Sequence, residues 1–81
     1  MKIEDVSIHC RISPEVIHYF IQESWIIPID PEELIFDAED IARIKFIHEL
    51  REIFAVNDEA VPIILHLVDQ LNLINLKFRE D

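Results

Sequence analysis

The 81-residue chain contains no glycine, and this absence limits the turns from which its fold can be built. Glycine adopts left-handed backbone conformations at little cost, so it is the usual residue at tight turns and helix ends. We therefore expect this chain to end its helices and turn its backbone at Asn, Asp or Pro. Phosphate-binding loops that depend on glycine are excluded.

A short turn between two predicted helices indicates a helix-turn-helix near the N-terminus. The first helix covers residues 3–10. The second begins after Ser13, a favourable N-cap, with Pro14 at its first position. Its apolar residues recur at helical spacing to about Glu23. Two helices joined by so short a turn have the geometry of a helix-turn-helix.

The following segment predicts a small β-wing. A β-branched run at residues 26–29 and the pair Ile35–Phe36 have the composition of two short strands. Residues 30–33, Asp-Pro-Glu-Glu, provide the turn between them. All charged residues at the tip of this wing are therefore acidic.

A long third helix is predicted after the wing, with Asp37 as its N-cap, continuing to about Phe54. Its apolar residues form one stripe: Ile41, Ile44, Ile47, Leu50 and Phe54. On its solvent side we expect two i,i+4 ion pairs, Glu39–Arg43 and Lys45–Glu49.

A fourth helix is expected to start near Asp58, because Pro62 fits only the first turn of a helix. Its main apolar stripe is Val61, Ile64, Leu65, Val68 and Leu71. Three further residues extend the apolar surface beyond what one core needs: Ile63, Leu67 and Ile74.

We expect residues 1–76 to form a single domain and residues 77–81 to form a short, frayed tail. Trp25, Phe46, Ile63 and Leu67 are most simply core residues; if exposed, they would form the apolar centre of a protein interface.

The charge of the chain is strongly acidic, with a net charge of −10. No Lys or Arg lies between Arg11 and Arg43, whereas eight acidic residues do. Duplex DNA and anionic membranes attract Lys and Arg, so both are expected to repel this chain at long range. A basic protein surface is the better match, because opposite fields steer the encounter of two proteins.

Several other classes of function have no support in the sequence. The single cysteine, Cys10, excludes an internal disulfide, and no signal peptide or membrane-spanning run is present, so a cytoplasmic location is expected. The four histidines have no metal-ligand spacing, so we expect no metal. Acidic residues in bulk are not a tuned acid–base pair, so we expect neither an enzyme nor a bound cofactor.

The order of these elements resembles the MerR-like winged helix-turn-helix fold, which is mainly α with four helices and a small two-stranded β-wing. The segment VNDEAVPIILHLVDQL is similar to a pattern of the chaperone modulator CbpM family. The matching residues are Val56, Asn57, Ile64, Leu65, Leu67, Asp69 and Leu71. Ala60 stands where that family usually has Gly, and residues 35–37 resemble its Val-Phe-Asp segment before the long helix. The resemblance extends from Ile3 to about Leu73.

CbpM proteins bind the J-domain of the DnaJ-like co-chaperone CbpA and inhibit its activities. The resemblance therefore implies a non-enzymatic modulator that covers the basic helix of a J-domain and blocks its action on a DnaK-type chaperone. The acidic residues that we expect at this interface are Glu23, Asp30, Glu32, Glu33 and Glu39.

Two alternatives remain open at this point. The first is a DNA-binding MerR-like repressor similar to HspR. Such proteins usually have an Arg at the position of Ile17 and bases in the wing, where this chain has Glu32 and Glu33, so nucleic acid is not the expected partner. The second alternative is an adaptor that forms a homodimer through its last helix.

Overall fold

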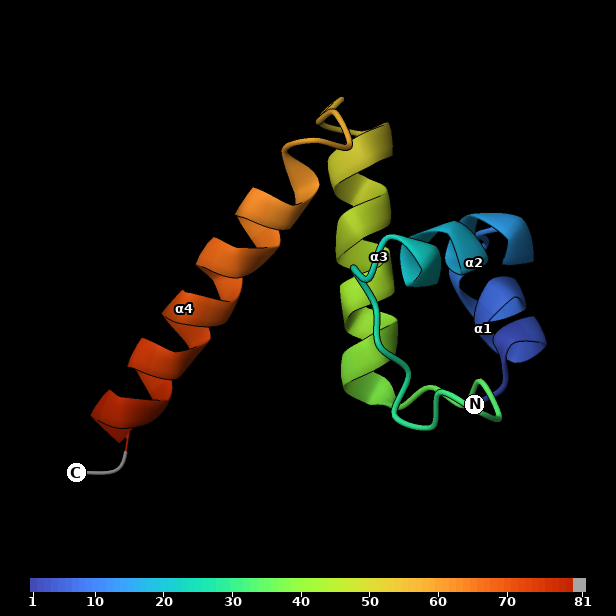
Figure 1. Ribbon diagram of the computed structural model, residues 1–81, viewed down its shortest axis with the longest axis horizontal. Coiled ribbons are helices and arrows are strands. Elements are labelled where there is room, and N and C mark those ends of the chain that lie inside the picture. The colour runs from blue at the N-terminus through green and yellow to red at the C-terminus, as the bar shows by residue number, and fades with distance from the viewer. Residues whose placement is uncertain (80–81) are drawn as a thin grey trace.

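The computed structural model describes residues 1–79 and has four helices (Figure 1). These are α1 (Ile3–Cys10), α2 (Pro14–Gln22), α3 (Ala38–Glu52) and α4 (Val61–Arg79). In Figure 1, α1 and α2 lie on one side of α3, while α4 diverges from the C-terminal end of α3 as an arm. No helix in the described part of the chain is long and apolar enough to span a membrane.

The helix-turn-helix is present where the sequence predicts it. The amide of Ile12 donates to the Ser7 carbonyl over 3.1 Å and so closes the end of α1. At the start of α2, the Ser13 hydroxyl accepts from the Val16 amide at 3.3 Å, and Pro14 occupies the first turn. The sequence predicts both the helix start and the short turn correctly because each depends only on local contacts.

The core lies where α1, α2 and α3 meet. The α3 stripe contributes Ile44 and Ile47, both 0% exposed, and Leu50. Phe54, which the sequence places on the same stripe, is 67% exposed. The reason is that α3 ends at Glu52, so the helical spacing no longer sets the direction of the Phe54 side chain. Trp25 is buried as expected. Its ring packs edge-on against the Tyr19 ring, with the two ring centres 5.6 Å apart.

The two-stranded wing is not confirmed, because residues 1–79 contain no strand. The wing is instead a turn, residues 30–35, closed by one pair of backbone hydrogen bonds between Asp30 and Ile35 (3.2 and 3.1 Å). The next rung of an antiparallel ladder would pair residue 28 with residue 37. Residue 28 is a proline without an N–H, and the Asp37 amide already donates to the Asp40 carboxylate over 3.1 Å. The ladder therefore stops after one pair.

A reciprocal capping box begins α3, as the N-cap prediction for Asp37 requires. The Asp37 carboxylate accepts from the Asp40 amide at 2.8 Å, and the Asp40 carboxylate accepts from the Asp37 amide. The same Asp40 oxygen also accepts from the Ile29 amide at 2.9 Å. The capping box thus fixes the first turn of α3 and also the segment that leads into the wing.

Four residues of the described chain have a left-handed backbone, and none of them is Asn or Asp: Arg11, Ser24, Leu34 and Ala55. The expectation for turn residues is therefore wrong at these positions. Arg11 and Ser24 follow α1 and α2, and in each case the next amide donates to a carbonyl five residues back. That hydrogen bond belongs to a standard helix-ending turn, which imposes the left-handed conformation on whichever residue stands there.

The fourth helix begins at Val61 instead of near Asp58, and Pro62 falls in its first turn as predicted. The Asn57 side chain accepts from the Ala60 amide at 3.0 Å and holds the preceding turn. The helix extends to Arg79, while Glu80 and Asp81, from the predicted tail, lie outside the described residues.

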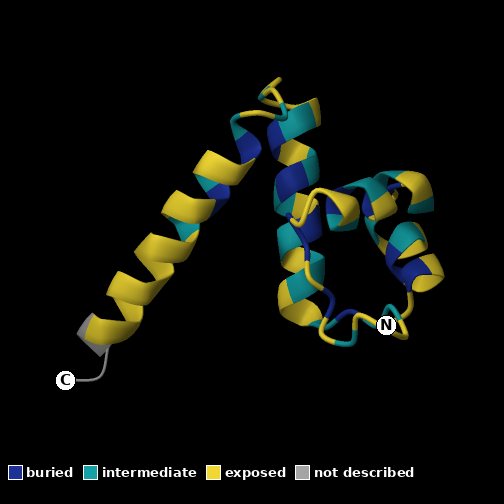
Figure 2. Ribbon diagram, in the orientation of Figure 1, coloured by how far each residue is buried: buried dark blue, intermediate teal, exposed yellow. Residues whose placement is uncertain are grey.

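Among the described α4 side chains only Val61 and Leu65 are buried, and Figure 2 shows the arm as mostly exposed. The interpretation of Ile63 and Leu67 as core is therefore wrong, since they are 63% and 61% exposed.

Candidate functional site

An arginine on α3 contacts the middle of the α4 arm. Arg43 donates Nε to the Trp25 carbonyl at 2.7 Å, and its two terminal nitrogens lie 2.9 and 3.4 Å from the carboxylate oxygens of Asp69. The guanidinium thus joins α3, α4 and the segment after α2. The expected surface pair Glu39–Arg43 does not form in the described chain, because Arg43 turns toward α4. Likewise, Lys45 lies 3.4 Å from His9 Nε2 instead of pairing with Glu49.

A second cluster ties the turn before α4 to α2 and α3. The Tyr19 hydroxyl donates to Asp58 Oδ2 at 2.6 Å, and Arg51 Nε donates to Asp58 Oδ1 at 2.8 Å. The hydrogen bond to Asp58 raises the pKa of Tyr19, and the hydrogen bond from Tyr19 lowers the pKa of Asp58, assisted by Arg51. The Arg51 guanidinium also lies 5.3 Å from the centre of the Tyr19 ring. These contacts hold the base of the arm on the core.

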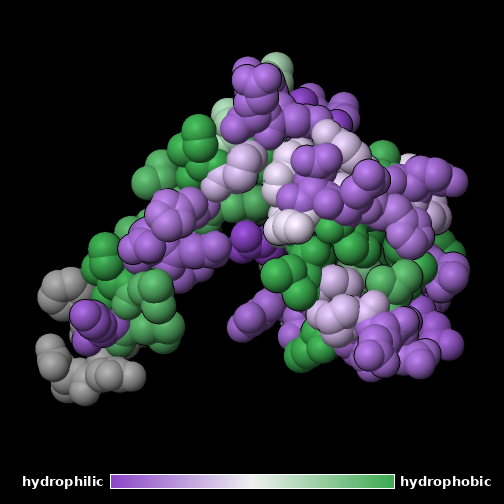
Figure 3. Space-filling view, in the orientation of Figure 1, coloured by the Kyte–Doolittle hydropathy of each residue, from purple (hydrophilic) through white to green (hydrophobic). Residues whose placement is uncertain are grey.

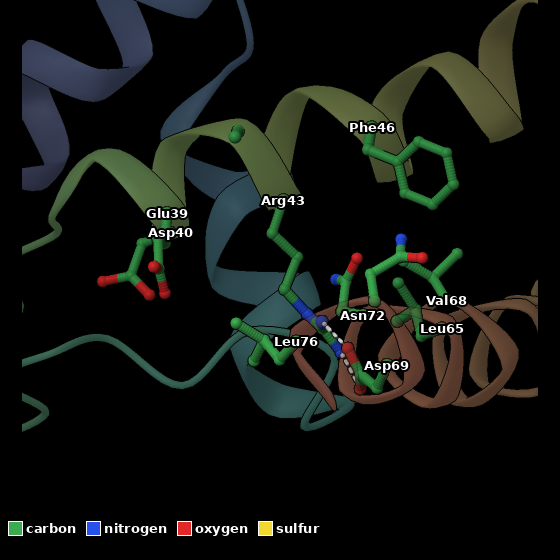
Figure 4. A pocket seen from close by; sticks show the side chains of 11 residues that line it. Glu39, Asp40, Arg43, Phe46, Leu65, Val68, Asp69, Asn72 and Leu76 are labelled. Carbon is green, nitrogen blue, oxygen red and sulfur yellow. Dashed lines mark hydrogen bonds and ion pairs between the residues drawn. The ribbon is translucent and has the colours of Figure 1, made fainter. Parts of the chain in front are cut away.

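A groove opens between α3 and α4, with a volume of about 740 Å³. We call it the α3–α4 groove. It is lined from α3 by Glu39, Asp40, Ala42, Arg43 and Phe46, and from α4 by Leu65, Val68, Asp69, Asn72, Asn75 and Leu76. Figure 3 shows the hollow between the arm and the N-terminal body, and Figure 4 shows Arg43 crossing the groove toward Asp69. The closed end is apolar, whereas the open end carries carboxylates and amides.

The structure places three of the five predicted interface residues in one turn. Glu32 and Glu33 are exposed at the tip of the wing, and Asp30 is half-buried with Oδ1 accepting from the Glu33 amide at 3.1 Å. Glu39 is exposed in the first turn of α3, where it lines the α3–α4 groove. Glu23 is exposed at the end of α2, which lies level with the middle of α3 and well away from the wing in Figure 1. Three of the five acids, Asp30, Glu32 and Glu33, therefore lie together in the wing turn. Glu39 and Glu23 each lie apart from them.

The outward face of α2 carries no Lys or Arg that could bind a phosphate. Ile17, the position at which the sequence argument expects an Arg in DNA readers, is 0% exposed and packs in the core. Its identity therefore gives no information about DNA binding. The exposed side chains of α2 are Glu15, His18 and Gln22. Together with the wing tip, this face carries acids and lacks Lys and Arg.

No metal-binding constellation is found in the described chain. No group of three or more His, Cys, Asp or Glu residues there is placed to hold a metal ion. Burial raises the pKa of the Cys10 thiol, and nearby Lys45 only partly opposes this effect. A thiol with a raised pKa is a poor nucleophile near neutral pH.

One face of α4 points away from the rest of the protein and is apolar. We call the residues Ile63, Leu67, Leu71 and Ile74 the outer stripe of α4; they follow one another at intervals of four, four and three. Their exposed fractions range from 49% to 63%. Ile63, Leu67 and Ile74 extend the apolar surface of the chain beyond the core, and the structure leaves all three exposed.

The apolar pattern of the sequence does not indicate the α3–α4 groove. Of its lining, Asp69 and Leu65 appear in the sequence pattern of residues 56–71, but that pattern contains no information on the angle between the two helices. The groove is bridged by Arg43 and Asp69, a pair 26 residues apart in the sequence.

Comparison with protein families matches residues 1–64 to the family described as MerR HTH family regulatory protein. Comparison with curated proteins and with solved structures gives no significant match. The matched range contains the helix-turn-helix, the wing, α3 and the first turn of α4.

Proposed function

Because this chain belongs to the MerR HTH family of regulatory proteins, we propose that it is a non-enzymatic regulator whose target is a basic protein surface. The specific target is the J-domain of a CbpA- or DnaJ-like co-chaperone, and binding inhibits the action of that co-chaperone on a DnaK-type chaperone. This target rests on the resemblance of residues 56–71 to the CbpM pattern and on the charge of the molecule.

The charge of the helix-turn-helix surface is the observation that carries this proposal. The exposed face of α2 and the wing tip, which DNA-reading members of such a fold would direct at phosphates, carry Glu15, Glu32 and Glu33. Arg43 and Arg51 are both held in ion pairs within the protein. The release of counterions from phosphates requires Lys or Arg, and this face has neither, so it is poorly suited to DNA. A basic protein helix has the complementary charge.

The mechanism that follows is occlusion. Acidic side chains that cover the basic helix of a J-domain would make that helix inaccessible to the DnaK-type chaperone. Neither partner needs covalent chemistry, so the regulator acts stoichiometrically and its effect depends on its concentration and affinity.

Titration calorimetry of the chain against a purified J-domain, at two salt concentrations, tests the proposal. We expect binding that weakens as salt is raised, because the attraction is between opposite exposed charges. The double variant Glu32→Lys, Glu33→Lys should bind more weakly than wild type. The matched control is Glu49→Lys, Glu52→Lys, which changes the net charge equally on exposed positions in the C-terminal part of α3. Equal weakening by both variants would indicate that binding responds only to the net charge of the protein. In that case the wing would not be part of the interface.

Duplex DNA is the second titrant in the same experiment. Salt-sensitive binding to DNA, without binding to the J-domain, would refute the proposal and favour the HspR-like alternative. Absence of J-domain binding by a folded chain would also refute it.

A second candidate function, self-association as an adaptor, is favoured by the outer stripe of α4. Two or more turns of exposed Leu and Ile on one helix face are typical of helix-pairing surfaces. Sedimentation equilibrium of the wild-type chain tests this candidate. A monomer at all concentrations up to the millimolar range would exclude it.

A further inference from the structure

The α3–α4 groove combines an apolar floor with acidic walls. Phe46, Leu65 and Val68 form the floor near the closed end, and Leu65 is only 4% exposed. Glu39 and Asp40 stand at the start of α3, on the α3 wall of the groove (Figure 4). Asn72 and Asn75 add amide groups from α4. The groove therefore offers both apolar contact and polar partners.

The net charge of the groove is negative. It contains three carboxylates, on Glu39, Asp40 and Asp69, and one guanidinium, on Arg43. All three nitrogens of that guanidinium are already engaged, with Asp69 and the Trp25 carbonyl. Glu39 has no ion pair among the residues that the structure describes. A ligand in the groove would therefore meet free negative charge and no free positive charge.

We propose that the α3–α4 groove is the docking site for a basic amphipathic helix of the partner protein, with its apolar side on the groove floor and its Lys or Arg side chains at Glu39 and Asp40. This inference rests on the proposed function and names the site on this chain. A helix satisfies its own backbone hydrogen bonds, so it can lie in a groove between two helices that offers no strand edge. The basic flanks of such a helix complement the carboxylates.

The charge of the chain argues against a second copy as the occupant. Residues 1–60 carry fourteen acids and five bases. The same residues of a second copy would therefore be repelled by Glu39 and Asp40. In addition, the outer stripe of α4 is absent from the groove lining, so pairing through that stripe would leave the groove free.

The groove is separate from the wing, so the two surfaces can be tested independently. In Figure 1 the wing lies on one side of the N-terminal end of α3 and the α4 arm on the other. Of the five acids expected at the interface, only Glu39 lines the groove. The wing acids can steer the partner from a distance, whereas the groove makes the short-range contact that sets the dissociation rate.

Asn75→Arg is the variant that tests the groove. Asn75 is exposed on α4, and Arg is a better helix former than Asn, so the variant should fold. The new side chain puts a positive charge and bulk where the basic helix would lie. Gln70→Arg is the matched control, since it makes the same change of charge on the same helix at an exposed position that does not line the groove. A second groove variant, Ala42→Arg, acts from the α3 side.

Two probes are titrated into each variant: a purified J-domain, and a synthetic helical peptide with Leu on one face and Lys on the other. For both probes we expect Asn75→Arg and Ala42→Arg to weaken binding by about tenfold or more, because like charges are brought together in the groove. Gln70→Arg should change the affinity by less than about twofold, as expected for an exposed charge outside the interface. Amide chemical shifts of wild type should move at residues 42, 72 and 75.

The outcomes separate this inference from the proposed function. J-domain binding that is unaffected by both groove variants would overturn the groove site and leave the proposed function standing. Binding of the Lys/Leu peptide in the groove without J-domain binding would support the site and refute the proposed partner. If neither probe binds the folded wild-type chain, both are refuted.

Discussion

Replacing Ala55 with glycine should stabilise this protein, although Ala→Gly substitutions usually destabilise. Ala55 lies just after α3 with φ of 53°, and the Val56 amide that follows it donates to the Leu50 carbonyl at 2.9 Å. A left-handed conformation costs a residue with a Cβ roughly 1–2 kcal/mol, and glycine removes that cost. Glycine also gives the unfolded chain more conformational entropy, which offsets roughly 0.5–1 kcal/mol of this stabilisation. The expected net stabilisation is therefore between about 0 and 1.5 kcal/mol, with a central value of about 0.75 kcal/mol. Ala55 is exposed, so no packing is lost.

The matched control is Ala42→Gly, the same substitution at an exposed position within α3. There the backbone is already helical, and glycine should destabilise by about 1 kcal/mol. The two variants should thus differ by about 1–2.5 kcal/mol in the free energy of unfolding, measured by urea denaturation followed by circular dichroism. In a domain of this size, about 1 kcal/mol corresponds to a shift of roughly 4–8 °C in Tm. If Ala55→Gly destabilises as much as Ala42→Gly does, the left-handed turn at Ala55 does not exist in solution.

Two further predictions concern the core and the base of the arm. Ile17→Ala should lower the free energy of unfolding by about 2–5 kcal/mol, because Ile17 is 0% exposed and its loss leaves a cavity; a change below about 1 kcal/mol would mean that Ile17 is a surface residue. Asp58→Asn should destabilise at neutral pH and have a smaller effect under acidic conditions, because the pKa of Asp58 is lowered in the folded state, mainly by the Tyr19 hydrogen bond. The stability that the carboxylate contributes is therefore present above its ordinary pKa, near 3.8, and is lost as the pH falls through the lower folded value. Urea denaturation of both chains near pH 6 and below pH 3 measures this, and an equal difference at the two pH values would contradict the assignment.

The sequence by itself determined the features that depend on contacts within a few residues. The N-caps Ser13 and Asp37, and Pro62 in the first turn of α4, are in the structure as predicted. Each is decided by one side chain and the backbone amides next to it, and those contacts are independent of the rest of the fold. The acidic charge of the helix-turn-helix surface was also readable, since it requires only a count of residues.

The remaining features became clear only from the three-dimensional structure, and the direction of α4 among them depends on contacts between distant segments. The wing did not extend into strands, because Pro28 lacks the next donor and the capping box uses the Asp37 amide. The left-handed residues after α1 and α2 were fixed by hydrogen bonds that close the helix ends, whatever side chain was present. The direction of α4 was set by Arg43 with Asp69, and by Asp58 with Tyr19 and Arg51. A pattern of apolar residues predicts which face of a helix can be buried, but contacts between distant residues decide whether anything covers it. For this reason Leu65 is buried, whereas Ile63 and Leu67, on the same helix, face solvent.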